Sequence, residues 1–183
     1  MARHSPTLSR IELADWRAVH SWASLAQVCR FQTWGPNTEE QTRVFVTAAV
    51  EAQSHRPQHR FSYMARVEDE VVGMGELHVR SRGHRQGEIT YVVHPRVRGQ
   101  GIGTAIGKHL LAWGFEDLGL HRIRATCDPQ NPGSAQVLRK LGMTWEGRHR
   151  HTVLIRDGWR DSEMFSILEE EWRAVTQYRA SAG

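Results

Sequence analysis

Three glycines, Gly99, Gly101 and Gly103, occupy every second position of a segment that leads into an apolar helical pattern. A plain tight turn between a strand and a helix needs only one glycine. Three of them leave a row of backbone N–H groups unobstructed, and the helix N-terminus adds its positive dipole end at the same place. Arg96 and Arg98 bracket the segment, and guanidinium groups pair with phosphate oxygens in a two-pronged geometry. Either could instead be a solvated surface residue, an alternative that is favoured slightly for Arg96. The spacing therefore predicts a binding site for a diphosphate.

Two nucleotide-binding motifs compete for the same segment, and the residues disfavour both. A dinucleotide fingerprint needs a glycine where Ile106 stands, and it follows the first strand of a parallel unit. A triphosphate loop would match Gly107 and Lys108, but it needs glycine at Ile102 and serine or threonine at His109. A diphosphate fits the segment without either of these motifs.

The elements that position this loop follow from local patterns. A helix over 15–28 and a second helix after Thr38, which has Gln41 at the capping-box position, begin the chain. A third helix follows the glycine segment, and Asn131 caps a fourth, with Pro132 at its first position and Gly142 at its end. β-branched and aromatic residues predict strands over 7–11, 60–67, 70–79, 87–95 and 121–127, and a closing hairpin over 145–172 with positive φ angles at Asp157 and Gly158. This order predicts an α+β fold with a mixed, mostly antiparallel sheet flanked by helices.

Composition bounds the class of protein. With 183 residues and 39% apolar content, the chain has room for one sizeable core, so we expect a single domain over 1–183. No apolar stretch is long enough to span a bilayer and the first ten residues lack the apolar core of a signal peptide, which favours a cytoplasmic protein. Cys29 and Cys127 do not form a disulfide framework. The net charge of +4 suits an anionic ligand, and it also leaves nucleic acid open as a partner.

The sequence resembles the GNAT superfamily of N-acetyltransferases, and within it the RimJ/RimL-type branch. Arg98-Gly99-Gln100-Gly101-Ile102-Gly103 matches the acetyl-CoA signature of that superfamily. The segment GEITYVVHP resembles the strand before the loop, NPGSAQVLRKLGM resembles the Asn-x-x-Ser helix of the branch, and the closing segments resemble its terminal hairpin. The match covers nearly the whole chain.

The resemblance implies a cleft for acetyl-CoA between two splayed parallel strands. By position, Val92, Val93 and His94 would offer their main chain to the pantetheine arm, and an amide near Val93 would stabilise the oxyanion. The loop Arg98, Gly99, Gln100, Gly101, Ile102 and Gly103, with Thr104 opening the helix, would hold the diphosphate. Because CoA carries about four negative charges, the net positive charge of the chain would favour its binding. Asn131 would either contact the pantetheine or only cap its helix.

The resemblance also implies catalytic residues. Ser134 would donate a proton to, or hydrogen-bond, the departing CoA thiolate, or alternatively only satisfy local N–H groups. Glu88 would be the general base, directly or through water, with Glu76 as the second choice, and Tyr91 would be a core or cleft-wall residue. The base matters most for a lysine-type amine, which is neutral in about one molecule in 2,000 at pH 7, against about one in seven for an α-amine.

The expected activity is therefore transfer of an acetyl group to a primary amine in a ternary complex, without a covalent cysteine intermediate. The acceptor would be a protein N-terminal α-amine or a small-molecule amine such as an antibiotic or polyamine, and a homodimer is possible because branch members often pair. We expect no metal, because His149, His151, His55 and His59 have no cysteine or carboxylate at ligand spacing. Two alternatives remain, a non-catalytic CoA sensor and a basic nucleic-acid-binding domain, and scattered arginines disfavour the latter.

Overall fold

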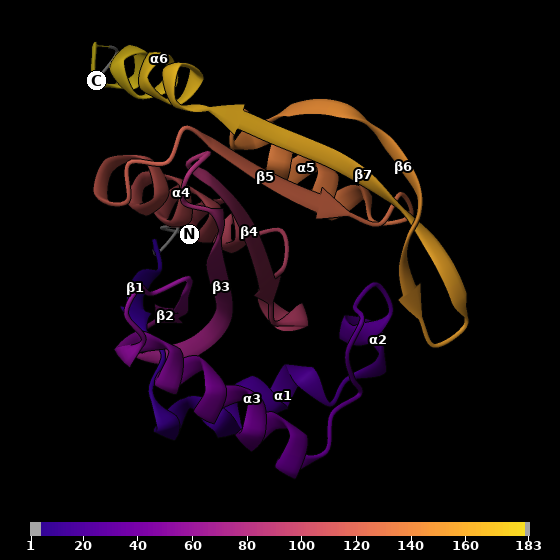
Figure 1. Ribbon diagram of the computed structural model, residues 1–183. Helices are drawn as coiled ribbons and strands as arrows, with labels where there is room; N and C mark the ends of the chain where they lie inside the picture. Colours follow the sequence, from indigo (N-terminus) through magenta and orange to yellow (C-terminus); the bar gives the residue numbers. More distant parts are fainter. Residues whose placement is uncertain (1–4, 182–183) are drawn as a thin grey trace.

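A seven-stranded sheet forms the centre of the computed structural model, which describes residues 5–181 (Figure 1). Its strand order is β1-β2-β3-β4-β5-β7-β6, and every neighbouring pair is antiparallel except β4 and β5. The strands are β1 (Thr7–Arg10), β2 (Arg60–Val67), β3 (Glu70–Ser81), β4 (Gln86–Val93), β5 (Arg122–Cys127), β6 (Thr144–Ile155) and β7 (Gly158–Leu168). The mixed α+β architecture expected from the element order is confirmed.

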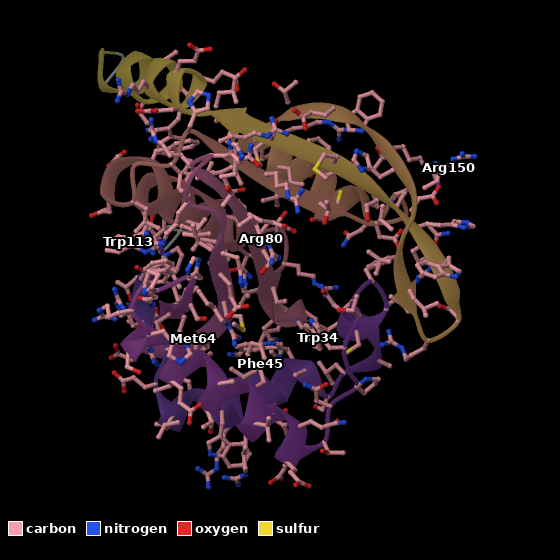
Figure 2. All side chains as sticks on the ribbon, viewed as in Figure 1. Trp34, Phe45, Met64, Arg80, Trp113 and Arg150 are labelled. Atoms are coloured by element: carbon pink, nitrogen blue, oxygen red, sulfur yellow. The ribbon has the colours of Figure 1, made fainter. Side chains whose placement is uncertain are left out.

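Helices cover both faces of this sheet. They are α1 (Trp16–Ala23), α2 (Ala26–Cys29), α3 (Glu39–Glu51), α4 (Ile102–Ala112), α5 (Pro132–Lys140) and α6 (Glu169–Ser181). Helices α1 and α3 bury a small core that includes Trp22, Val46 and Met64 against one face of the sheet, and Figure 2 labels Met64 above these helices. Helices α4 and α5 contribute to a larger core with Ile106 and Leu138. None of the helices within residues 5–181 is long and apolar enough to cross a bilayer.

Two glycines allow α4 to lie close to its neighbours. A Cβ at Gly75 of β3 would stand 2.3 Å from Ile106 Cγ2, and a Cβ at Gly107 would stand 2.4 Å from Leu141 Cδ1. No side chain fits at either position without a shift, because real Cβ atoms do not approach other atoms so closely. These contacts fix where α4, and therefore the glycine loop before it, lies on the sheet.

Several local predictions are confirmed. Thr38 and Gln41 form the capping box of α3, with Gln41 N donating to Thr38 Oγ1 at 3.2 Å and Thr38 N donating to Gln41 Oε1 at 2.9 Å. Asn131 caps α5, and Gly142 follows that helix with φ +88°.

Three expectations were wrong. The helix expected over 15–28 breaks into α1 and α2, because the Ser24 hydroxyl donates to His20 O at 2.8 Å and Leu25 adopts an extended conformation. The expected hairpin ends early, since Leu168 N donates to Glu171 Oε2 at 2.9 Å and α6 begins at Glu169. In the turn between β6 and β7, Gly158 alone has a positive φ.

Candidate active site

Strands β4 and β5 separate after three paired positions. Gln86 pairs with Arg122, Gly87 with Ile123 and Glu88 with Arg124, and no later pair joins the two strands. Beyond this point lies a cleft of about 570 Å³, lined by the ends of both strands, the glycine loop, α5, the segment 27–33 and the β6–β7 hairpin. The splayed parallel pair expected from the resemblance is therefore present.

The main chain of β4 turns alternately toward β3 and toward this cleft. His94 N donates to Val72 O at 2.8 Å, and His94 O accepts from Val97 N at 3.1 Å, so both groups of His94 are used within the fold. Because N–H and C=O directions alternate along a strand, Val92 also faces β3 and Val93 faces the cleft. Of the three residues expected to offer their main chain, Val93 is placed to do so.

The glycine loop has an open backbone. Gly99 and Gly101 have φ angles of +79° and +88°, and a Cβ at either position would meet no atom within 4 Å. Gly101 is the N-cap of α4, so the unpaired N–H groups of the first helical turn lie directly after it. A Cβ at Gly103 would make an ordinary contact of 3.5 Å with Val137 Cγ2, so this third glycine is not required by space. The geometry suits an anion at the start of α4.

The two arginines beside the loop differ. Arg96 forms an ion pair with Glu70, whereas Arg98 lines the cleft and has no ion-pair partner among the described residues. Thr104, in the first turn of α4, also lines the cleft. Arg98 is therefore the flanking arginine that is placed to meet a phosphate.

Ser134 lies in the first turn of α5 and contacts the cleft. Its backbone N–H donates to Asn131 Oδ1 at 3.1 Å, so Asn131 acts as the helix cap, and the amide nitrogen of Asn131 has no partner among the described residues. The hydroxyl oxygens of Ser134 and Tyr91 lie 2.9 Å apart. Tyr91 is a wall residue of the cleft, as expected, and its contact with Ser134 could not be read from the sequence.

Burial sets the protonation of two groups beside Ser134. It raises the pKa of Tyr91 to about 12, although the hydrogen bond to Ser134 lowers it slightly. Burial, followed by the charge of Glu163 and a smaller effect of Asp128, raises the pKa of the Cys127 thiol to about 11, and Arg139 and the hydrogen bond to Ser134 lower it by less. Both groups are protonated near neutral pH.

Glu88 lies at the last paired position, where the strands begin to separate. Its Oε2 accepts from Arg80 Nε at 3.0 Å and from Arg124 Nε and Nη2 at 3.1 and 3.0 Å. Its Oε1 accepts no hydrogen bond from the residues that the structure describes.

Glu76 lies on the neighbouring strand, with its Cα opposite that of Thr90. Arg60 Nε donates to Glu76 Oε1 at 2.8 Å, the Ser62 hydroxyl donates to the same oxygen at 2.5 Å, and His78 Nε2 lies 3.2 Å from Oε2. Burial alone would raise the pKa of Glu76, but these hydrogen bonds and the charge of Arg60 outweigh it and leave the pKa below its usual value.

The structure gathers most of the expected site residues at one cleft. Those that line it are Val92, Val93, Arg98, Gly99, Gly101, Ile102, Gly103, Thr104, Asn131 and Ser134. Glu88 is not among the lining residues and lies two positions before Thr90, which is. Gln100 is exposed on the loop, and the side chain of His94 accepts from Arg96 N at 3.2 Å outside the cleft wall. No three histidine, cysteine, aspartate or glutamate side chains within residues 5–181 gather as a metal site.

Arg156, in the β6–β7 turn, joins one wall of the cleft to the segment after α2. Its Nη1 donates to Gly35 O at 2.7 Å and to Trp34 O at 3.2 Å, and its Nη2 donates to Cys29 O. Figure 2 labels Trp34 beside α2, where the hairpin approaches it. No motif in the sequence indicated this residue.

Comparisons with known proteins agree with this geometry. Residues 7–144 match the sequence profile of the acetyltransferase (GNAT) domain. The uncharacterized N-acetyltransferase YnaD of Bacillus subtilis is 31% identical over 165 residues, which cover 90% of this chain and 94% of that protein. Spermidine N(1)-acetyltransferase of Escherichia coli is 27% identical over 93% of this chain and 90% of its own length.

A solved structure shows the same architecture. The GNAT-family acetyltransferase from Bacillus anthracis superposes with a TM-score of 0.79 at 31% identity, over 91% of this chain and 96% of that one. Together with the profile match over most of the chain and the split between β4 and β5, this shows that the chain belongs to the GNAT family of N-acetyltransferases.

Proposed function

We propose that this N-acetyltransferase moves the acetyl group of acetyl-CoA directly to a primary amine while both substrates are bound. The observation that carries the proposal is the split between β4 and β5, with the open glycine loop at one end of the cleft and the Tyr91–Ser134 pair in its wall. When bound, acetyl-CoA supplies an activated acetyl thioester.

The residues present fit such a group. Gly99 and Gly101 leave an open cradle before the N-terminus of α4, and Arg98 adds an unpaired positive charge, so this end would hold the phosphates with Thr104. Val93 would pair its main chain with the pantetheine amides and offer its N–H to the developing oxyanion. The Asn131 side chain would add a contact through its free amide nitrogen.

Ser134 is the proposed proton donor at the leaving end. Its hydroxyl hydrogen would pass to, or bond, the sulfur as the thiolate departs. Tyr91 is protonated and accepts or donates at Ser134 Oγ, so it would orient the serine hydroxyl as a positioning residue. Cys127 is a protonated thiol in the wall, which supports direct attack rather than an acetyl-cysteine intermediate.

Glu88 is the proposed general base at the amine end. Oε2 is held by Arg80 and Arg124, which leaves Oε1 to accept the ammonium proton, directly or through water. Glu76 remains the second choice, because both of its oxygens are already engaged by Arg60, Ser62 and His78.

The names of similar proteins point to two acceptor classes. One is spermidine, in the enzyme of Escherichia coli, and the other is ribosomal protein S5, in a Vibrio fischeri enzyme that is 22% identical. A Vibrio cholerae spermidine N-acetyltransferase of the same fold, 18% identical, has been solved with CoA and spermine. The proposed acceptor here is an α-amine of a peptide or a small-molecule amine.

A thiol-release assay tests the proposal. The protein is incubated with acetyl-CoA and with N-terminal peptides, amino acids, aminoglycosides or polyamines, and free CoA thiol is measured. Amine-dependent release that falls strongly in Ser134→Ala and Glu88→Gln supports the enzyme. CoA binding without release from any amine would indicate the sensor, and salt-dependent oligonucleotide binding without CoA affinity would indicate the nucleic-acid-binding alternative.

A further inference from the structure

We infer that Arg80 and Arg124 form a binding site for a carboxylate of the acceptor, so that the preferred acceptors are amino acids or peptides with a carboxylate near the reacting amine. The inference rests on the proposed function and names the acceptor class for the same cleft. An enzyme with such a site would differ from one whose acceptor is a polyamine.

The two arginines stand at the point where the strands separate. Glu88 and Arg124 are the last paired residues of β4 and β5. Two positions further, on the same face of each strand, Thr90 and Thr126 line the cleft, and neither hydroxyl has a hydrogen-bond partner among the described residues. Arg80 and Arg124 lie outside the residues that line the cleft, so a ligand would reach them by extending past these two free hydroxyls toward the last paired position.

The charges at this point do not balance. One carboxylate, Glu88, accepts all the hydrogen bonds that bind it to two guanidinium groups. Nη1 and Nη2 of Arg80 and Nη1 of Arg124 have no partner among the described residues, and the two side chains are 51% and 46% exposed. The two guanidinium groups therefore carry one surplus positive charge and have free N–H donors. A carboxylate can accept two such N–H donors in fork geometry. Figure 2 labels Arg80 beside β4.

The surrounding ion pairs do not remove this surplus. Glu76 is paired with Arg60 and His78 on one side, and Arg122 is paired with Glu146 on the other. Each of these carboxylates therefore offsets one arginine, and the charges of the two ion pairs sum to zero when His78 is neutral. The excess remains at Arg80 and Arg124.

Only one carboxylate in the lining of the cleft, that of Asp128, has no ion-pair partner among the described residues. Two acidic residues line it. Asp161 accepts from Arg148 Nε at 2.8 Å and from His151 N at 3.0 Å, and Asp128 Oδ1 accepts from Gln130 N at 2.7 Å. Arg98 and Lys140 also line the cleft without an ion-pair partner among the described residues, so the unpaired charges of the lining are positive on balance and disfavour the several positive charges of spermidine.

The first measurement uses the acetylated products, because they carry no titrating amine. N-acetyl-alanine, N-acetyl-aspartate and N-acetyl-glutamate are compared with their uncharged amides for equilibrium binding to the CoA-loaded protein. We expect at least one carboxylate to bind about tenfold more tightly than its amide, and we expect this difference to fall as salt rises. Arg80→Gln should remove the difference. Arg150→Gln is the matched control, since Arg150 is exposed on β6 and unpartnered among the described residues (Figure 2).

The second measurement is thiol release from acetyl-CoA with matched peptide amides, beginning Ala-Glu or Ala-Gln and Asp-Ala or Asn-Ala. We expect kcat/KM to favour the acidic member of a pair, and Arg80→Gln to remove the preference mainly through KM. Equal use of both members, or a higher kcat/KM for spermidine, would overturn the inference. Carboxylate-selective product binding without any thiol release would instead leave the anion site standing and overturn the proposed transferase activity.

Discussion

Tyr91 Oη lies 2.9 Å from Ser134 Oγ, although the two residues are 43 positions apart in the chain. Tyr91 Oη also lies 3.2 Å from Ser134 O, so the phenol can donate its one hydrogen to either oxygen and is held against the first turn of α5. Because the pKa of Tyr91 is about 12, the phenol keeps its proton throughout the working pH range. The contact holds the oxygen atom of the serine hydroxyl in the wall of the cleft.

Removal of either hydroxyl should slow turnover without weakening acetyl-CoA binding. We expect Ser134→Ala to lower kcat about a hundredfold, and Tyr91→Phe to lower it less. The double variant should be no slower than Ser134→Ala, because Tyr91 acts through the serine. Tyr63→Phe, which alters a buried tyrosine outside the cleft, is the control. Additive losses in the double variant would show that Tyr91 does not act through Ser134.

The glycine loop should be sensitive to backbone conformation rather than to side-chain volume. Gly101 has φ +88°, so Gly101→Ala should cost about 1 kcal/mol and raise the dissociation constant for CoA, as measured by calorimetry. Gly103→Ala should bind CoA almost normally, because a Cβ there makes only ordinary contacts. Gly83→Ala, in the open β3–β4 turn, is the control. Full CoA affinity in Gly101→Ala would contradict the proposed phosphate site.

Both cysteines should be inert in the folded protein. Burial raises the pKa of Cys29, against a smaller effect of Arg156, and raises that of Cys127 to about 11. A disulfide reagent such as Ellman's should therefore react with neither thiol at pH 8, and with both after denaturation. Mass spectrometry after incubation with acetyl-CoA alone should show no added acetyl group. An acetylated Cys127 would replace direct transfer with a two-step mechanism.

Arg156 should stabilise the wall of the cleft. Arg156→Ala removes a charged donor from Trp34 O, Gly35 O and Cys29 O, and we expect a loss of about 1.5–3 kcal/mol in the free energy of unfolding. We also expect KM for the amine to rise more than KM for acetyl-CoA. Arg150→Ala should change neither. Equal effects of the two variants in urea unfolding would show that these contacts contribute little.

Glu76 should contribute stability at neutral pH that acid removes. Its folded pKa lies below that of the unfolded chain, so the contribution is present above the unfolded value of about 4.3 and is lost as the pH falls through the lower folded value. Glu76→Gln should be about 1–3 kcal/mol less stable at pH 7, and the gap should narrow below about pH 4. Glu51→Gln, at the exposed end of α3, is the control for loss of charge. A pH-independent gap would show that packing, rather than charge, holds Glu76.

Local chemistry explains what could be predicted from the sequence. The Thr38–Gln41 box and the Asn131 cap depend on residues three positions apart. The glycine loop depends on positive φ angles that favour one residue type. The break at Ser24 was missed because an apolar face continued across it, and a hydroxyl bond to His20 O decided the end of the helix.

The electrostatics of the site could not be predicted in this way. Arg80, Glu88 and Arg124 come from three strands, and they meet only because β3, β4 and β5 have one particular register. A shift of one residue would turn one of the three to the opposite face of the sheet. Tyr91 and Ser134 likewise meet only after α5 has packed beside β4.

The long reach of Arg156 also has a consequence for biosynthesis. The carbonyls that it binds were made 121 to 127 residues earlier, and a ribosome adding about 5–20 residues per second needs on the order of ten seconds to cover that interval. During translation, the segment that contains Cys29 and Gly35 therefore lacks its hydrogen bonds to Arg156 until the hairpin has been synthesised. A nascent chain released before the hairpin would keep the glycine loop and lack the hydrogen bonds by which Arg156 holds the segment that ends at Gly35.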